Sequence, residues 1–239
     1  MLQMENDVSA RRTLNWPLAV VFDLDGTLVD SSGDLTTSLN ELLAERQLAP
    51  FSRMETIGFV GGGIALLVER ALRTRKLDPS PEELSAAVDR YKTVYSGRLT
   101  ESTHLYDGAL DVLDALKVRG VRTAVCTNKT EALARGIIGG LGFNGRIDVI
   151  VGGKPDRALK PSPAPLLDAL SQLGVKADDA IMVGDSSADV KCAKAANVRS
   201  ICVSFGFSSI PVRELGADAV IDSYAGFDDA CQTLRVATA

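Results

Sequence analysis

The segment from Leu18 to Ser31 restricts the possible folds of this chain more than any other part of the sequence. It begins with an apolar run that is rich in β-branched residues and has about the length of a buried strand. The run ends abruptly at Asp23 and Asp25, which are followed by a glycine and by hydroxyl residues. Carboxylates are unfavourable inside a core strand, but at its carboxyl end they can face the crevice where open parallel sheets bind ligands. The segment therefore predicts a strand of a parallel sheet with two acids at a binding crevice.

The two acids are expected to face the same side, because alternate residues of an extended segment point in the same direction. Two like charges this close need a partner of opposite charge. Mg²⁺ suits the position, since it prefers a few carboxylate or carbonyl oxygens and keeps several waters. Asp23 and Asp25 therefore predict a divalent cation at this strand end.

Polar residues follow apolar strand candidates again later in the chain. Thr127-Asn128-Lys129 follows one candidate strand, and the segment from Gly184 to Asp189 follows another. Lys160 stands before a helix candidate in a loop stiffened by prolines. Because the carboxyl ends of parallel strands meet at one edge of the sheet, we expect these residues to share one pocket with Asp23.

The pattern of the chain changes character at two points. Residues 34–99 have helical periodicity without a convincing strand, and one helix is expected to begin at Ser80-Pro81 and run towards Leu99. From Tyr106 onwards, strand and helix candidates alternate, which predicts a parallel sheet with helices on both faces. The expected strands are 123–126, 148–151, 180–183, 200–203 and 219–221, and the expected helices are 109–118, 131–141, 164–173, 188–196 and a terminal helix.

Composition limits the classes of partner. With 239 residues, 46% hydrophobic and 24% charged, the chain has the composition of an ordinary globular protein. Its net charge of -5 argues against a nucleic-acid partner, and no apolar run approaches the roughly 20 residues that span a membrane. The polar opening from Met1 to Pro17 is interpreted as a frayed tail. The four cysteines are far apart without C-x-x-C spacing, which favours reduced thiols and a cytoplasmic protein.

Taken together, these segments resemble the haloacid dehalogenase-like hydrolase superfamily from about Leu18 to the end of the chain. The residues that carry the resemblance to its four motifs, in the family's order, are Asp23-Leu24-Asp25-Gly26-Thr27, Thr127, Lys160-Pro161, and Gly184-Asp185 through Asp189. The helical insert resembles the small α-helical cap of that superfamily. Within it, the nearest likeness is to phosphoglycolate phosphatase, on Gly61-Gly62-Gly63 and the helix that follows, Tyr106-Asp107-Gly108, and Thr127-Asn128-Lys129.

The resemblance implies a Rossmann-like catalytic core, residues 1–30 and 104–239, with an inserted cap, residues 31–103. It implies a Mg²⁺-dependent phosphatase that works through an aspartyl-phosphate. Asp23 would be the nucleophile, and Asp25 would protonate the leaving oxygen and then accept a proton from the attacking water. The ligands of Mg²⁺ would be Asp23, the main-chain carbonyl of Asp25, and Asp185.

The phosphate would be bound by the hydroxyl of Thr127, the main-chain N–H of Asn128, Gly26 and the ammonium group of Lys160. Lys160 would also keep the nucleophile ionised.

Two further assignments concern the surroundings of these groups. Asp189 would position metal-bound waters or the catalytic lysine instead of binding the metal directly. Lys154 is the alternative for the lysine, but the Pro-x-Pro-x-Pro pattern follows Lys160.

The substrate depends on the cap, where Gly61, Gly62 and Gly63 allow two interpretations. They form either a plain loop between helices or an anion site at the start of a helix from Ile64, suited to a substrate carboxylate. His104 is interpreted as a hinge or surface residue.

The expected reaction is hydrolysis of a small phosphorylated metabolite, 2-phosphoglycolate, to glycolate and phosphate. The alternatives are another small-molecule phosphatase acting on a sugar phosphate, a nucleotide or pyrophosphate, then a phosphosugar mutase, and, from another class, a non-catalytic sensor of a phosphate ligand. We expect a monomer or homodimer with neither a nucleic-acid nor a membrane partner.

Overall fold

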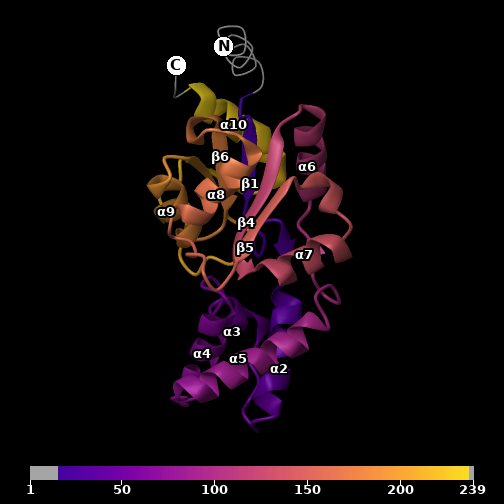
Figure 1. Cartoon of the computed structure of the whole chain (residues 1–239), viewed down its shortest axis with the longest axis vertical. Coiled ribbons are helices and arrows are strands. Elements are labelled where there is room, and N and C mark those ends of the chain that lie inside the picture. The colour runs from indigo at the N-terminus through magenta and orange to yellow at the C-terminus, as the bar shows by residue number, and fades with distance from the viewer. Residues whose placement is uncertain (1–15, 237–239) are drawn as a thin grey trace.

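The structure is a computed structural model that describes residues 16–236 (Figure 1). The interpretation of the opening segment as a frayed tail therefore falls outside the described residues, except for Trp16 and Pro17. Within the described part, no helix is long and apolar enough to cross a membrane.

A parallel sheet forms the centre of the core, with the strand order β5-β4-β1-β6-β7-β8 among the described residues. The chain builds outward from β1 in one direction and then in the other, so β1 lies where the strand order reverses. Ligands bind at this point in open parallel sheets. The strands are β1 Ala19–Phe22, β4 Arg122–Thr130, β5 Val149–Gly153, β6 Ala180–Gly184, β7 Arg199–Val203 and β8 Ala219–Ile221.

Helices cover both faces of this sheet, as predicted. On one face, α6 (Ala109–Val118), α7 (Glu131–Gly140) and α10 (Phe227–Val236) pack on Val20 and Phe22 of β1. On the other face, α8 (Ala164–Leu173) and α9 (Ser187–Ala195) pack on Ala19 and Val21. Since β1 is buried on both faces, its sequence is continuously apolar instead of alternating.

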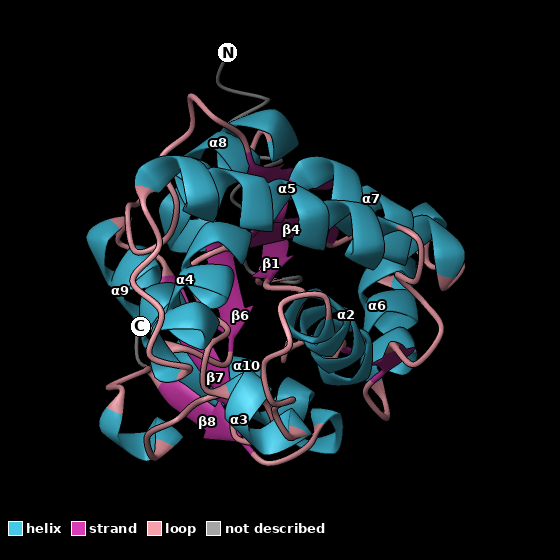
Figure 2. Ribbon diagram, turned by 90° about the horizontal axis from the view of Figure 1, so that it is seen from below, coloured by secondary structure: helices cyan, strands magenta, loops and turns pink. Residues whose placement is uncertain are grey.

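Four helices between β1 and the rest of the core pack around a separate apolar cluster, which includes Leu39, Leu67 and Tyr91. They are α2 Ser32–Ala44, α3 Arg53–Ile57, α4 Ile64–Thr74 and α5 Pro81–Ser96, and we call them the helical unit. Helix α5 begins where the sequence predicts, because Ser80 and Glu83 form a capping box ahead of it. The helical unit lies beyond one end of the sheet, and Figure 2 shows it from below, in front of the strands.

A small antiparallel pair joins the helical unit to the core. Strand β2 (Val29–Asp30) pairs with β3 (His104–Leu105), and Asp30 lies opposite His104. The sequence does not predict these strands, because two residues are too few for a periodic pattern. His104 is exposed, which agrees with its interpretation as a surface or hinge residue. The division of the chain at residues 31 and 103 stays a prediction.

Beside this pair, Asp34 of α2 ties the two connections together. Its carboxylate accepts hydrogen bonds from the main-chain N–H of Ser102 (2.9 and 3.1 Å), and from the main-chain N–H (2.9 Å) and hydroxyl (2.6 Å) of Thr103. The side chain of Asp34 is buried. The segments that enter and leave the helical unit are therefore held side by side.

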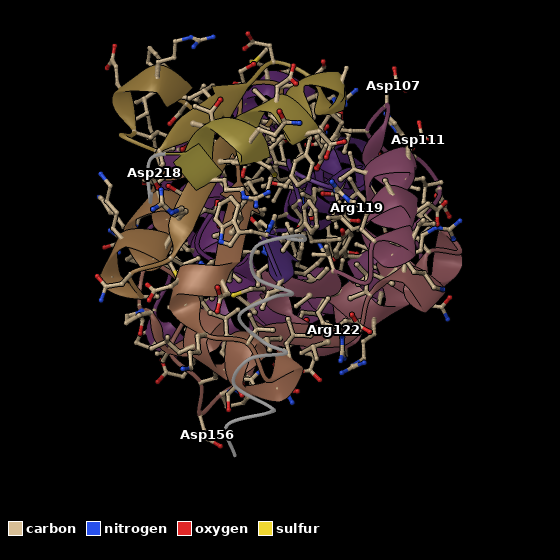
Figure 3. All side chains as sticks on the ribbon, turned by 90° about the horizontal axis from the view of Figure 1, so that it is seen from above. Asp107, Asp111, Arg119, Arg122, Asp156 and Asp218 are labelled. Carbon is tan, nitrogen blue, oxygen red and sulfur yellow. The ribbon has the colours of Figure 1, made fainter. Side chains whose placement is uncertain are left out.

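The opposite end of the core carries charged side chains that form ion pairs. Arg119 lies 3.0 Å from Asp228, and Arg122, at the start of β4, lies 3.1 Å from Asp148. Figure 3 shows the core from this end, with Arg119 and Arg122 labelled. These cations therefore lie at the amino end of the sheet and are neutralised locally.

Candidate active site

A pocket opens where the carboxyl ends of the strands face the helical unit. Its lining from the core includes Asp23, Asp25, Thr127, Asn128, Lys129, Lys160, Asp185 and Ser186. Its lining from the helical unit includes Val60, Gly61, Gly63, Ile64 and Leu67. The predicted convergence of β1, β4 and β6 at one sheet edge is therefore correct, and both acids of the first motif face this pocket.

Asp23 lies directly after β1 and is held by two donors on the same oxygen. Its Oδ1 accepts a hydrogen bond from the main-chain N–H of Leu24 (2.7 Å) and lies 3.0 Å from Nζ of Lys160. Its Oδ2 has no hydrogen bond among the described residues. Burial raises the pKa of Asp23 to about 6, although the attraction of Lys160 acts in the opposite direction.

Lys160 has three buried partners for its ammonium group. Besides Asp23, Nζ donates to the main-chain carbonyl of Cys126 at 2.7 Å and to Oδ1 of Asp189 at 2.6 Å. Burial alone would lower the pKa of Lys160, but Asp189 and Asp23 outweigh it and raise the pKa. Lys160 is therefore a fixed positive charge beside Asp23.

Three carboxylates, those of Asp23, Asp185 and Asp189, place ligand atoms within 4.8 Å of one another. Burial raises the pKa of Asp185 well above its usual value, and nearby Asp189 and Asp23 add to the effect. If all are ionised, the carboxylates of Asp23, Asp25, Asp185 and Asp189 carry four negative charges, and the ammonium groups of Lys129 and Lys160 carry two positive charges. The site then has two negative charges in excess. The donor set and the excess charge both fit a divalent cation.

Asp189 fits a positioning role better than a metal ligand. Its Oδ1 accepts from Lys160, and its Oδ2 accepts from the main-chain N–H (3.0 Å) and hydroxyl (2.5 Å) of Ser186. Both oxygens are therefore already used. In Asp185, the main-chain N–H of Phe207 donates to Oδ2 at 2.6 Å, and Oδ1 accepts no hydrogen bond from the residues that the structure describes. Asp23 and Asp185 are thus the side chains that could hold the cation.

Gly26 explains how the first and last motifs approach each other. Its φ is +80°, and a Cβ at this position would lie 2.2 Å from Oδ2 of Asp185. Any larger residue would push the two loops apart. The role of Gly26 in binding phosphate stays a prediction, since Gly26 is not among the residues that line the pocket.

The second motif belongs to a strand that is longer than predicted. Strand β4 continues to Thr130, and its pairing with β5 is irregular between Cys126 and Thr130. Thr127 is buried and faces the pocket. The side chain of Asn128 bonds to the main chain of Lys160, at 2.9 Å to its carbonyl and 2.8 Å from its N–H. Asn128 therefore fixes the loop that carries the lysine.

Asp25 is bound to a residue for which the sequence suggests no chemical role. Nζ of Lys129 lies 2.9 Å from both carboxylate oxygens of Asp25, and the hydroxyl of Ser31 donates to Oδ1 at 2.6 Å. Asp25 does not belong to the three-carboxylate cluster, and its predicted part in metal binding would involve only its main-chain carbonyl.

Gly61 and Gly63 line the pocket at the start of helix α4. Gly63 is the N-cap residue, with φ +85°, and Gly61 has φ +114°. Gly62 is not part of the lining. The alternative lysine, Lys154, is half-exposed and pairs with Glu131 at 2.8 Å, outside the pocket.

Comparison with known proteins agrees with this geometry. A model of the haloacid dehalogenase-like hydrolase family matches residues 20–203. The chain belongs to this family. It is 45% identical over 217 residues to the phosphoglycolate phosphatase of Rhodospirillum rubrum, which covers 89% of this chain and 90% of the relative. It is 37% identical to that of Agrobacterium fabrum, over 90% of this chain and 91% of the relative.

Solved structures of other proteins share the fold. A predicted phosphoglycolate phosphatase from Haemophilus somnus has a TM-score of 0.83 and 27% identity, over 88% of this chain and 96% of that one. A mutant of CbbY from Rhodobacter sphaeroides, in complex with xylulose-(1,5)bisphosphate, has a TM-score of 0.72 and 26% identity, over 87% and 94%. The chain is a phosphoric monoester hydrolase similar to the phosphoglycolate phosphatases.

Within this family fold, one residue at the site escapes sequence reasoning. The sequence places Lys129 after a candidate strand beside Thr127 and Asn128, but it predicts no chemical role for this lysine. The available signal was its spacing of two from Thr127, which puts both residues on the same side of an extended segment.

Proposed function

We propose that this protein is a Mg²⁺-dependent phosphatase that hydrolyses 2-phosphoglycolate to glycolate and phosphate through an aspartyl-phosphate on Asp23. The observation that carries the proposal is the way in which the two carboxylate oxygens of Asp23 are bound. One of its oxygens is held by Lys160 and by the N–H of Leu24, while the other faces no donor among the described residues. A buried carboxylate with a free oxygen in a pocket that contains fixed cations is suited to attack a phosphorus atom in line with the leaving group.

The remaining side chains divide the work. The Lys160 ammonium and the Thr127 hydroxyl would bind the oxygens of the phosphoryl group as it is transferred. Asp25 would give a proton to the oxygen that leaves with glycolate, and would later take one from the water that hydrolyses the aspartyl-phosphate. When bound by Asp23, Asp185 and the Asp25 carbonyl, Mg²⁺ would offset the repulsion between carboxylate and phosphate.

We further propose that residues 31–103, which contain the helical unit, act as a cap over this pocket. Helix α4 and the glycines before it already contribute to the lining. A closed cap would exclude bulk water and strengthen the electrostatic interactions of the phosphoryl group.

A sugar phosphate is the second candidate substrate. It is favoured by the likeness to CbbY, whose structure contains a sugar bisphosphate. Identity to the named phosphoglycolate phosphatases is higher, at 45% and 37%, which supports phosphoglycolate first.

The test is a ranking of kcat/KM with Mg²⁺ over 2-phosphoglycolate, sugar phosphates, nucleotides and pyrophosphate. Phosphoglycolate is expected at the top, and a sugar phosphate at the top would replace it as the substrate. Asp23→Asn should abolish turnover and keep the far-ultraviolet circular dichroism spectrum of the native protein. Release of phosphate at the wild-type rate by this variant would exclude Asp23 as the nucleophile. The cytoplasmic location and the monomeric or dimeric state remain predictions.

A further inference from the structure

Lys129 is a buried cation that faces the pocket. Its side chain is only 3% exposed, yet the residue belongs to the lining. Nζ contacts both oxygens of Asp25 at 2.9 Å, and it lies 4.7 Å from the centre of the Tyr95 ring. Burying an ammonium group is unfavourable unless its charge and its donors are used.

An ammonium group has three N–H donors. The two contacts with Asp25 use at most two of them, and the face of the Tyr95 ring attracts the charge without accepting a conventional hydrogen bond. Lys160, the other lysine of the pocket, already contacts three oxygens. Among the described residues that line the pocket, Lys129 is therefore the lysine with donor capacity left for a ligand.

The neighbour of Lys129 indicates which part of a ligand would reach it. Asp25 is the group that we propose as the acid for the leaving oxygen. In 2-phosphoglycolate a single carbon separates that oxygen from the carboxylate, so standard bond lengths keep the carboxylate oxygens within about 4 Å of it. A cation that touches both oxygens of Asp25 is therefore adjacent to the position of the substrate carboxylate.

We propose that Lys129 binds the carboxylate of the substrate and thereby sets the preference for phosphoglycolate over phosphate monoesters that lack an acid group. The inference rests on the proposed function. Lys129 keeps one donor on Asp25 and turns another to the carboxylate, so the same side chain orients the acid and recognises the substrate. The Tyr95 ring, whose centre lies 4.7 Å from Nζ, attracts the charge of the ammonium group.

The experiment compares 2-phosphoglycolate with ethyl phosphate, which replaces the carboxylate by a methyl group. The variants are Lys129→Met and Lys129→Gln, and the matched control is Lys154→Met, which removes a lysine outside the pocket. Each Lys129 variant should lower kcat/KM for phosphoglycolate at least about 10-fold more than for ethyl phosphate, because a charged hydrogen bond is lost with one substrate only. The control should keep the wild-type ratio of the two substrates.

A binding measurement separates recognition from proton transfer. In an Asp23→Asn background that cannot turn over, calorimetry with Mg²⁺ should show that Lys129→Met or Lys129→Gln weakens phosphoglycolate binding at least about 10-fold and changes ethyl phosphate binding less. Circular dichroism checks that each variant is folded.

The outcomes distinguish this inference from the proposed substrate. If both substrates lose kcat/KM by the same factor and phosphoglycolate binding is unchanged, Lys129 only positions Asp25 and the inference is wrong. If the wild type has the same kcat/KM for ethyl phosphate and for phosphoglycolate, the proposed substrate is wrong, and the inference is overturned with it. If the wild type prefers phosphoglycolate and the Lys129 variants keep that preference, only the inference is overturned.

Discussion

Nζ of Lys160 lies 3.0 Å from Oδ1 of Asp23, and the two side chains are 2% and 13% exposed to solvent. The same nitrogen contacts Asp189 in the first turn of α9. One ammonium group thus connects the end of β1, the start of α9 and the loop before α8. Its removal would leave two buried carboxylates without their counter-charge.

Lys160→Met is therefore expected to lower kcat by about 10²- to 10³-fold, the range found for the loss of one donor to a transition-state oxyanion. It should also lower the melting temperature, because the buried carboxylates of Asp23 and Asp189 lose the positive charge that neutralises them. Steady-state kinetics and thermal denaturation measure the two effects. Lys154→Met is the control and should change neither, since Lys154 is half-exposed. A Lys160→Met enzyme with the wild-type kcat would contradict the role of Lys160 at the phosphoryl group.

When the divalent metal ion is removed, the thermal stability of the protein should depend on pH in a defined direction. The pKa of Asp23 in the folded protein is about 6, above its usual 3.8, so between these values the folded state binds more protons than the unfolded state. The contribution of the protonated Asp23 carboxyl to the free energy of unfolding is therefore fully present below about pH 4 and is lost as the pH rises through 6. Asparagine does not ionise, so only the wild type loses this contribution. In EDTA, the melting temperature of Asp23→Asn should therefore rise relative to that of the wild type as the pH increases from 4 to 7.

The exposed Asp107, labelled in Figure 3, provides the control for this measurement. Asp107→Asn should follow the wild type over the whole pH range. Adding Mg²⁺ should reduce the advantage of Asp23→Asn, because a bound cation favours the ionised carboxylate. A difference between Asp23→Asn and wild type that does not vary with pH would exclude the raised pKa.

Replacing Asp34 should loosen the joint between the core and the helical unit. In Asp34→Ala, the main-chain N–H groups of Ser102 and Thr103 lose their acceptor. A buried donor without a partner costs about 1–3 kcal/mol, and each kcal/mol lowers the melting temperature by about 2–4 °C in a protein of this size. Thr37→Ala, which removes an exposed hydroxyl from the same helix, should leave the melting temperature unchanged. Equal melting temperatures for the two variants would show that Asp34 does not hold the joint.

Alanine at Gly63 should disturb the pocket. The φ of +85° is unfavourable for any residue with a Cβ, and that atom would lie 3.4 Å from the main-chain carbonyl of Asn128. We expect a higher KM for phosphoglycolate and a loss of stability of about 1 kcal/mol. In Gly139→Ala, by contrast, the new Cβ meets nothing within 4 Å and lies in helix α7.

Gly139→Ala should therefore stabilise the protein by up to about 1 kcal/mol with no change in KM. Thermal denaturation and steady-state kinetics on the two variants make the comparison. A Gly63→Ala enzyme with the KM and melting temperature of the wild type would show that the glycine is not needed for the geometry of the pocket.

The strands and helices of the core follow from the sequence because each has one dominant local signal. Helices α6 and α8 match their predicted bounds, since Gly120 and Gly174, both with positive φ, follow their ends. The bounds of β4 do not follow, because its last residues are polar and the irregular pairing near Thr127 depends on β5. Strands β2 and β3 depend on each other across the whole helical unit and have no local signal.

The same distinction applies to the site. Asp23, Asp25, Thr127, Lys160 and Asp185 follow strand or loop patterns and are found in one pocket, as the sequence predicts. The partners of each group could not be predicted, because Lys129 with Asp25 and Asn128 with the main chain of Lys160 are contacts between segments distant in sequence. Sequence pattern identifies which strand ends meet, whereas the three-dimensional packing decides which atoms touch.

The pairing of β2 with β3 has a consequence for how such enzymes can diversify. Because Asp30 lies opposite His104, the chain leaves the core and returns to it at one point. For the sheet, the entire helical unit is equivalent to a single long hairpin loop. One such loop could be exchanged for another during evolution while Asp23 and Asp25 stay at the end of β1 and Lys160 stays in the loop before α8, so a new substrate would not require a new catalytic core.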